Sequence, residues 1–71
     1  RQVEPKTISI LAETDTTITW DNPFEDADYT ATLTAFDANG NPVFPTIKGQ
    51  TKNDILVWAR KACTCRAIAA K

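Results

Sequence analysis

Polar and apolar residues alternate along several short stretches of this chain. The alternation is clearest over residues 29–35, where the positions between the apolar residues are all threonine. A period of two predicts a strand with one buried and one solvent-facing side, and threonine suits such a half-exposed pleated surface. Shorter stretches of the same pattern predict strands over 7–12 and 16–20.

The segment 21–28 (DNPFEDAD) interrupts this alternation and is rich in carboxylates. Pro23 disfavours a helical conformation for the residue before it, so the pattern predicts a loop. The main interpretation of its acidic side chains is a solvated loop surface. Calcium binding is the alternative, although the spacing is not that of an EF-hand; the candidate ligands are Asp21, Glu25, Asp26 and Asp28.

Glycine and proline divide the middle of the chain into short pieces. Asn39-Gly40 indicates a two-residue hairpin of type I′, which needs positive φ at both positions. Pro42 and Pro45 restrict the returning segment to an edge strand or irregular pairing. A second turn is expected at Gly49.

The last third of the chain is compatible with two structures. Residues 54–70 read either as one helix capped by Asn53, with basic residues toward its end, or as two strands. The run 55–59 is apolar on every side, and several residues after it are mediocre helix formers. The short strands and turns elsewhere favour two strands and an all-β sandwich of about six short strands.

The length of 71 residues bounds the chain to one small domain. We expect this domain to cover 7–71, with 1–6 as an arm or linker from a preceding segment. The net charge is −1 and the pI is about 5.1, which argues against nucleic acid as a partner. No apolar run approaches the roughly 18 residues that would insert into a membrane.

The side chains that most enzymes use are scarce here. There is no histidine, which removes the commonest general base and metal ligand, and Ser9 is the only serine. We therefore expect no enzyme activity, no cofactor and no metal site. Cys63 and Cys65 would point to the same face of a strand, at the limit for bridging, so we expect two free, buried thiols and assembly in a reducing compartment. The alternatives are an intermolecular bridge or a metal at a symmetry axis.

So small a core without a staple suggests oligomerisation. One face of the final strand would be smooth and apolar, which lets three backbones approach closely. We therefore expect a homotrimer with its contact on this face, formed by Cys63, Cys65, Ala67 and Ala69.

The order of these segments resembles a known family. An alternating strand ends in an aromatic, a loop NPFEDADY leads into a long alternating strand, and ILVWAR and CRAIA strands complete the chain. This order resembles the six-stranded sandwiches at the tips of phage tail fibres and related receptor-binding proteins, and H-type lectin domains. The resemblance implies that Phe24 plugs the core from its loop beneath Trp20, and that Tyr29 starts the next strand and locks the turn to the sheet.

The resemblance also implies a function. We expect a virion fibre, spike or tail-tip domain that is assembled in the host cytoplasm, trimerises, and attaches to a glycan or protein on the host-cell surface. The expected ligand surface is the 37–41 hairpin, because planar polar groups beside an aromatic face suit sugar hydroxyls. The candidate binding residues are Asp37, Asn39, Asn41 and Arg60. The alternatives are a purely structural fibre or capsid assembly module, and an immunoglobulin- or fibronectin-like accessory module of a secreted enzyme.

Overall fold

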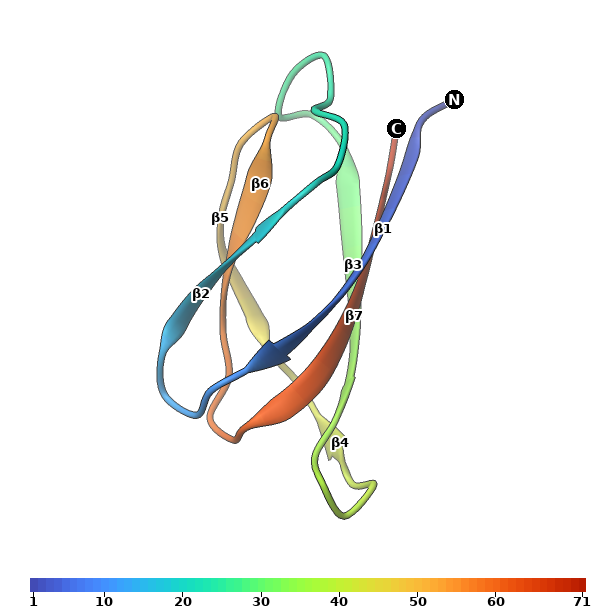
Figure 1. Cartoon of the computed structure of the whole chain (residues 1–71). Helices are drawn as coiled ribbons and strands as arrows, with labels where there is room; N and C mark the ends of the chain where they lie inside the picture. The colour runs from blue at the N-terminus through green and yellow to red at the C-terminus, as the bar shows by residue number, and fades with distance from the viewer.

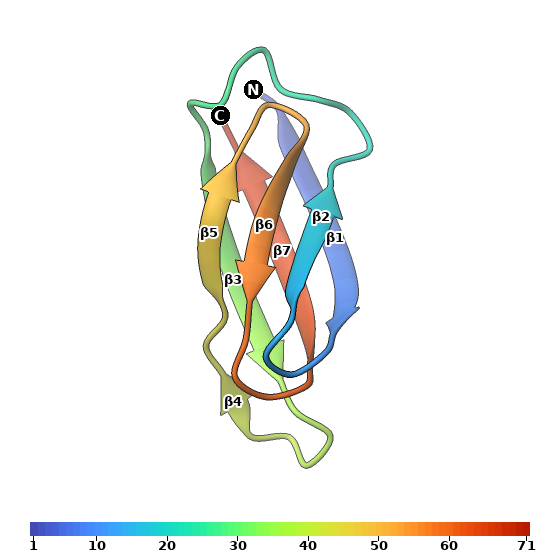
Figure 2. The ribbon, with the colours of Figure 1, turned by 90° about the vertical axis from the view of Figure 1, so that its left-hand side faces the viewer.

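The computed structural model describes all 71 residues as two antiparallel β-sheets (Figure 1). Their strands are β1 (Val3–Ile10), β2 (Asp15–Thr19), β3 (Thr30–Phe36), β4 (Pro42–Val43), β5 (Thr46–Gln50), β6 (Asp54–Trp58) and β7 (Cys63–Ala70). One sheet has the order β1-β7-β3-β4 and the other β2-β6-β5. Figure 2 shows the two sheets as the layers of a sandwich. The predicted all-β class is confirmed, and no helix capable of crossing a membrane is present.

The alternation in the sequence sorts side chains between the core and the solvent as predicted. In β3 the three threonines are exposed, whereas Ala35 is buried and Leu33 partly buried. On the opposite sheet Ile18, Ile55 and Val57 are fully buried. β-branched side chains of this kind pack well between pleated sheets, so the core lies along the whole length of the two layers.

The last third of the chain forms two strands, as the pattern favoured. β7 is a central strand that pairs with β1 on one side and β3 on the other. Its inward face carries only small side chains, all of them buried, and its outward face carries Thr64, Arg66 and Ile68. Small residues on a central strand leave room for the larger side chains of the facing sheet.

The first strand begins earlier than expected, because residues 3–6 belong to β1 and are not a free arm. β1 pairs with β7 from Val3↔Ala70 to Ile10↔Cys63. Pro5 is tolerated because β1 is an edge strand. Alternation did not reveal this extension because the inward-facing positions 4 and 6 are Glu and Lys. The buried Glu4 carboxylate is satisfied by the loop beside it, where it accepts a hydrogen bond from the backbone N–H of Asn22 at 3.1 Å.

The hairpin after β3 also differs from the expected type. Only Gly40 has a positive φ, of 82°, so the turn is not type I′. The N–H of Gly40 donates to the carbonyl of Asp37 at 3.0 Å, and the N–H of Asp37 donates to the carbonyl of Asn41. This is a turn followed by a left-handed glycine, the usual form of a three-residue hairpin loop. Here Gly40 supplies the conformation that other residues adopt at a cost.

The returning segment passes from one sheet to the other. β4 pairs with β3 for only two residues, and β5 begins in the opposite sheet after Phe44 and Pro45. Gly49 does not form the expected turn. It lies within β5 next to an irregularity in the pairing with β6, between Ile47 and Gly49, which is a common place for glycine in a strand.

The loops gather at two opposite ends of the sandwich. The upper end in Figure 1 holds both termini, the loop 20–29 and the turn 51–53. The lower end holds the loops 11–14 and 59–62 and the hairpin 37–41 together with β4 and Phe44. We use upper end and lower end in this sense below.

Candidate functional site

An aromatic cluster closes the upper end. Phe24 is 3% exposed and stacks on Tyr29, with ring centroids 4.2 Å apart and ring planes 13° apart. Trp20 meets both rings edge-on, at 6.4 and 6.1 Å. Offset-stacked and edge-to-face pairs are the favoured arrangements of aromatic rings. The expectation that Phe24 plugs the core from its loop beside Trp20 is confirmed.

Hydrogen bonds fix this aromatic cluster to the turn between β5 and β6. The indole Nε1 of Trp20 donates to the Tyr29 hydroxyl at 2.9 Å. The Tyr29 hydroxyl lies 2.6 Å from the carbonyl oxygen of Thr51, to which it donates, and 3.1 Å from that of Asp54. The backbone N–H of Phe24 donates to the carbonyl of Lys52 at 2.8 Å. Tyr29 therefore locks the loop to the sheet, as the resemblance implied.

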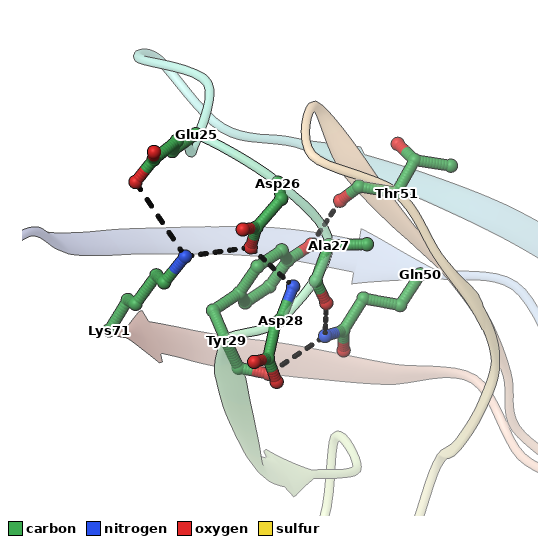
Figure 3. Close-up of polar contacts among 8 residues, drawn as sticks. All are labelled: Glu25, Asp26, Ala27, Asp28, Tyr29, Gln50, Thr51 and Lys71. Carbon is green, nitrogen blue, oxygen red and sulfur yellow. Dashed lines mark hydrogen bonds and ion pairs between the residues drawn. The ribbon is translucent and has the colours of Figure 1, made fainter.

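The carboxylates of this loop are exposed to solvent, and lysine side chains form ion pairs with several of them. Figure 3 shows the ammonium group of Lys71 between Asp26, at 2.7 Å, and Glu25, at 3.9 Å. The hydrogen bond from Lys71 holds the pKa of Asp26 below its usual value, and the N–H of Asp28 acts in the same direction. The same contact with Asp26 raises the pKa of Lys71.

The candidate calcium ligands do not converge on one point. Asp21 pairs with Lys6 at 2.8 Å, whereas Asp26 pairs with Lys71. No group of three or more His, Cys, Asp or Glu side chains is arranged to hold a metal ion. The placement of these carboxylates therefore fits the main interpretation of the sequence, a solvated loop surface.

Two glutamine side chains at the upper end donate hydrogen bonds to backbone carbonyls of the loop 20–29. The amide of Gln50 donates to the carbonyl oxygens of Ala27 and Tyr29, both at 2.8 Å (Figure 3). Just before β1, the amide of Gln2 donates to the carbonyls of Asn22 and Pro23, at 3.1 and 3.2 Å.

The largest hollow of the surface, about 530 Å³, also lies at the upper end. It is lined by Thr32, Ile68 and both terminal residues. Its charged side chains are of both signs, Arg1 and Lys71 with Asp28.

The lower end carries the predicted ligand residues but only partly as expected. The Asp37 carboxylate is bound within its own hairpin, where Oδ1 accepts the N–H groups of Asn39 and Asn41, both at 2.9 Å. This is the turn-stabilising role that Asp plays in many loops. Arg60 lies in the loop 59–62 and lines a different hollow from Asp37. The structure therefore brings these four residues to one end but not into a single site.

Large apolar side chains are exposed at this lower end. Phe44 is 86% exposed, Leu11 70% and Phe36 49%. Leu11 and Phe36 line a hollow of about 280 Å³ against Ala62. Exposed apolar side chains that gather in one region commonly mark a binding surface.

Phe44 lines a second hollow of about 270 Å³ with two cations, Arg60 and Lys61. The sequence predictions include Arg60 and an aromatic face beside the hairpin, but they do not include Lys61 or Leu11. The Pro42-Val43-Phe44-Pro45 segment indicates that Phe44 is exposed, because prolines that limit pairing leave an apolar residue between them without a strand neighbour.

The predicted trimer contact needs correction. Cys63, Cys65, Ala67 and Ala69 are 7%, 0%, 0% and 0% exposed. They face the β2-β6-β5 sheet of the same chain, so a second copy cannot reach them in the folded protein. Both thiols are free, as predicted. Burial raises the pKa of Cys63, and burial followed by the charge of Cys63 raises the pKa of Cys65 to about 11.

Comparison with known proteins does not assign a function to this geometry. No protein-family model matches the chain, and no curated protein or solved structure matches it.

Proposed function

We propose that this chain is a non-enzymatic attachment module, a virion fibre or tail-tip domain that binds a host-cell surface receptor through its lower end. The observation that carries the proposal is the exposure of Leu11, Phe36 and Phe44 at that end. Burying a side chain of this size against a partner contributes roughly 1.5–3 kcal/mol. The resemblance of the strand and loop order to phage fibre tips supports the kind of receptor, a host-surface glycan or protein.

The arrangement of the two ends suits such a role. Both termini lie at the upper end, so a chain continuing from either of them would leave the lower end free (Figure 1). The upper end is closed by aromatic packing and hydrogen bonds, and it exposes no comparable set of large apolar side chains. An attachment surface at the far end of a rigid sandwich is accessible to a cell surface.

A homotrimer in the virion is part of this proposal. Only 15 of the 71 residues are buried, so subunit contacts would add stability to a small core. Three copies would also strengthen binding to a repeated receptor through multivalency. The contact would have to use an exposed surface. The outward face of β7 with Ile68, which is 37% exposed, is the available apolar position on the central strand.

The strand order favours one alternative. If β2, β6 and β5 are compared with strands B, E and D of an immunoglobulin-type sandwich, then β3 and β7 correspond to C and F, and β1 takes the place beside F. This likeness of order concerns the fold and supports an accessory module of that type only by analogy. A purely structural assembly module would have the same fold and no receptor.

Binding of labelled protein to a panel of intact bacteria and to a glycan array tests the proposal. We expect the double variant Leu11→Ser/Phe44→Ser to bind at least about tenfold more weakly than the parent, since tenfold needs only about 1.4 kcal/mol. Val3→Ser is the matched control, because Val3 is 48% exposed but pairs with Ala70 beside the two termini, at the upper end. Equal loss in the control, or no binding by the parent to any cell or glycan, would contradict the proposal. Sedimentation of the parent tests the trimer.

A further inference from the structure

The hollow beside Phe44 combines an exposed ring with positive charge. It is formed where the chain crosses between the sheets after β4 and where the loop 59–62 joins β6 to β7. Phe44 and Pro42 supply apolar surface, and Arg60 and Lys61 supply two neighbouring cations. Phe44 is the most exposed large apolar side chain of the chain.

The two cations are not used by the protein itself. Lys6, Lys48 and Lys71 each have a carboxylate partner within 4 Å, whereas Arg60 and Lys61 have none. The carboxylate of the hairpin 37–41, that of Asp37, accepts hydrogen bonds from its own loop and lines the other hollow. Glu13 lies in the loop whose backbone is bonded to Ala59, but its carboxylate forms no ion pair with either cation. Two unpaired like charges next to each other favour an anionic ligand.

We propose that this hollow binds an acidic sugar residue, a hexuronic acid or a similar carboxylate-bearing sugar within a polysaccharide. This inference rests on the proposed attachment function and names its ligand class. The apolar C–H face of the sugar would lie on the Phe44 ring. The sugar carboxylate would pair with Arg60, whose planar guanidinium can hold a carboxylate through two parallel hydrogen bonds, and Lys61 would add a second charge.

The dimensions of the hollow favour one residue of a polymer over other anionic partners. Its volume of about 270 Å³ lies just below the range of about 300–1,000 Å³ that is typical of sites for drug-sized ligands. A membrane surface would require a broader basic area, and the only other cations outside ion pairs are distant in the fold, on the outer face of β7 and at the upper end. An acidic peptide could pair with the cations, but a carboxylate side chain alone leaves the exposed ring without a partner.

Binding of the full chain to soluble polymers, followed by titration calorimetry, tests the inference. The probes are polygalacturonate, dextran as a neutral polysaccharide and polyglutamate as an acidic peptide. We expect polygalacturonate to bind and dextran and polyglutamate to bind at least about tenfold more weakly. Binding should weaken as salt rises, because exposed charges are screened.

Two variants locate the site. Phe44→Ala and the double variant Arg60→Gln/Lys61→Gln should each weaken polygalacturonate binding at least about tenfold. The double variant Arg1→Gln/Lys52→Gln removes the same charge from exposed positions elsewhere and should bind as the parent does. All three sets change exposed side chains, and unchanged melting temperatures would show that the fold is intact.

Three results would overturn the inference. They are absence of polygalacturonate binding, equal binding of polyglutamate with no effect of Phe44→Ala, and equal loss in the Arg1/Lys52 control. The attachment proposal fails separately. If Leu11→Ser/Phe44→Ser abolishes binding to cells while polygalacturonate does not bind, attachment stands and the acidic-sugar ligand is wrong.

Discussion

Two phenylalanines illustrate how differently the two ends of this sandwich are built. Phe24 and Phe44 both lie in irregular segments that follow a proline or precede one, yet one is 3% exposed and the other 86%. Phe24 has two aromatic neighbours and a loop whose backbone is bonded to the next turn. Phe44 lies where the chain leaves one sheet for the other, next to a two-residue strand.

In this molecule the buried ring belongs to the loop whose polar groups find partners in neighbouring segments. At the upper end Gln50 and Lys71 satisfy carbonyls and carboxylates of the loop 20–29, and the hydroxyl of Tyr29 in this loop donates to the carbonyl of Thr51 (Figure 3). At the lower end the hairpin satisfies only its own groups through Asp37. The upper end therefore stabilises the fold, and the lower end carries the exposed apolar surface at which we propose binding.

The largest expected effect separates the two phenylalanines directly. Phe24→Ala should destabilise the protein by about 3–5 kcal/mol, because it deletes a buried ring from a cluster that cannot collapse freely. Phe44→Ala should change the free energy of unfolding by less than about 0.5 kcal/mol, as exposed substitutions usually do. Chemical denaturation of both variants provides the measurement. Similar losses at the two positions would refute the division of roles between the ends.

A smaller effect is expected from the hydroxyl that joins the cluster to the β5–β6 turn. Tyr29→Phe keeps the ring stack but removes the acceptor of the Trp20 indole and the donor to Thr51. Leaving such buried groups without partners costs about 1–3 kcal/mol. Denaturation midpoints should therefore fall less than for Phe24→Ala, and the fluorescence of Trp20 should shift as its indole N–H loses its partner. A variant as stable as the parent would mean that packing alone holds the loop.

Much of this architecture follows from local pattern, and the remainder depends on contacts between distant segments. Alternation was enough to predict which residues of β3 and β7 face inward, because a period of two leaves only the choice of the buried side. It was not enough to predict what the small inward residues of β7 face. Cys65 and Ala67 suit either a second chain or a second sheet, and the structure buries both between the two sheets of one chain.

The candidate site shows the same limit. The Asn39-Gly40 pair correctly predicted a hairpin, but turn chemistry alone did not show that the Asp37 carboxylate would accept hydrogen bonds from its own loop. Spacing also could not show that Arg60 and Phe44 line the same hollow, because they lie in two separate connections between the sheets, the loop 59–62 and the crossing after β4. The sequence and the structure therefore lead us to propose binding at the same end, and the structure was needed to propose which residues there act together.

The smallest expected effect concerns the ion pair that closes the acidic loop over the last strand. The contact with Lys71 holds the pKa of Asp26 below its ordinary value, and the folded-state pKa of Asp26 is therefore depressed. A depressed carboxyl pKa contributes stability above the unfolded-state value of about 3.9, and that stability is lost as the pH falls through the folded-state pKa. Both groups are solvent-exposed, so the contribution of this pair to the free energy of unfolding at neutral pH should be small.

Lys71→Gln should move the pKa of Asp26 back toward its ordinary value in a carboxyl NMR titration and leave the melting temperature nearly unchanged. Lys48→Gln removes the partner of Asp15 instead and should leave the titration of Asp26 as it is. A pKa of Asp26 that stays equally low in Lys71→Gln would assign the shift to the backbone N–H of Asp28, and the loop would then close by its own hydrogen bonds, as the hairpin at the lower end does.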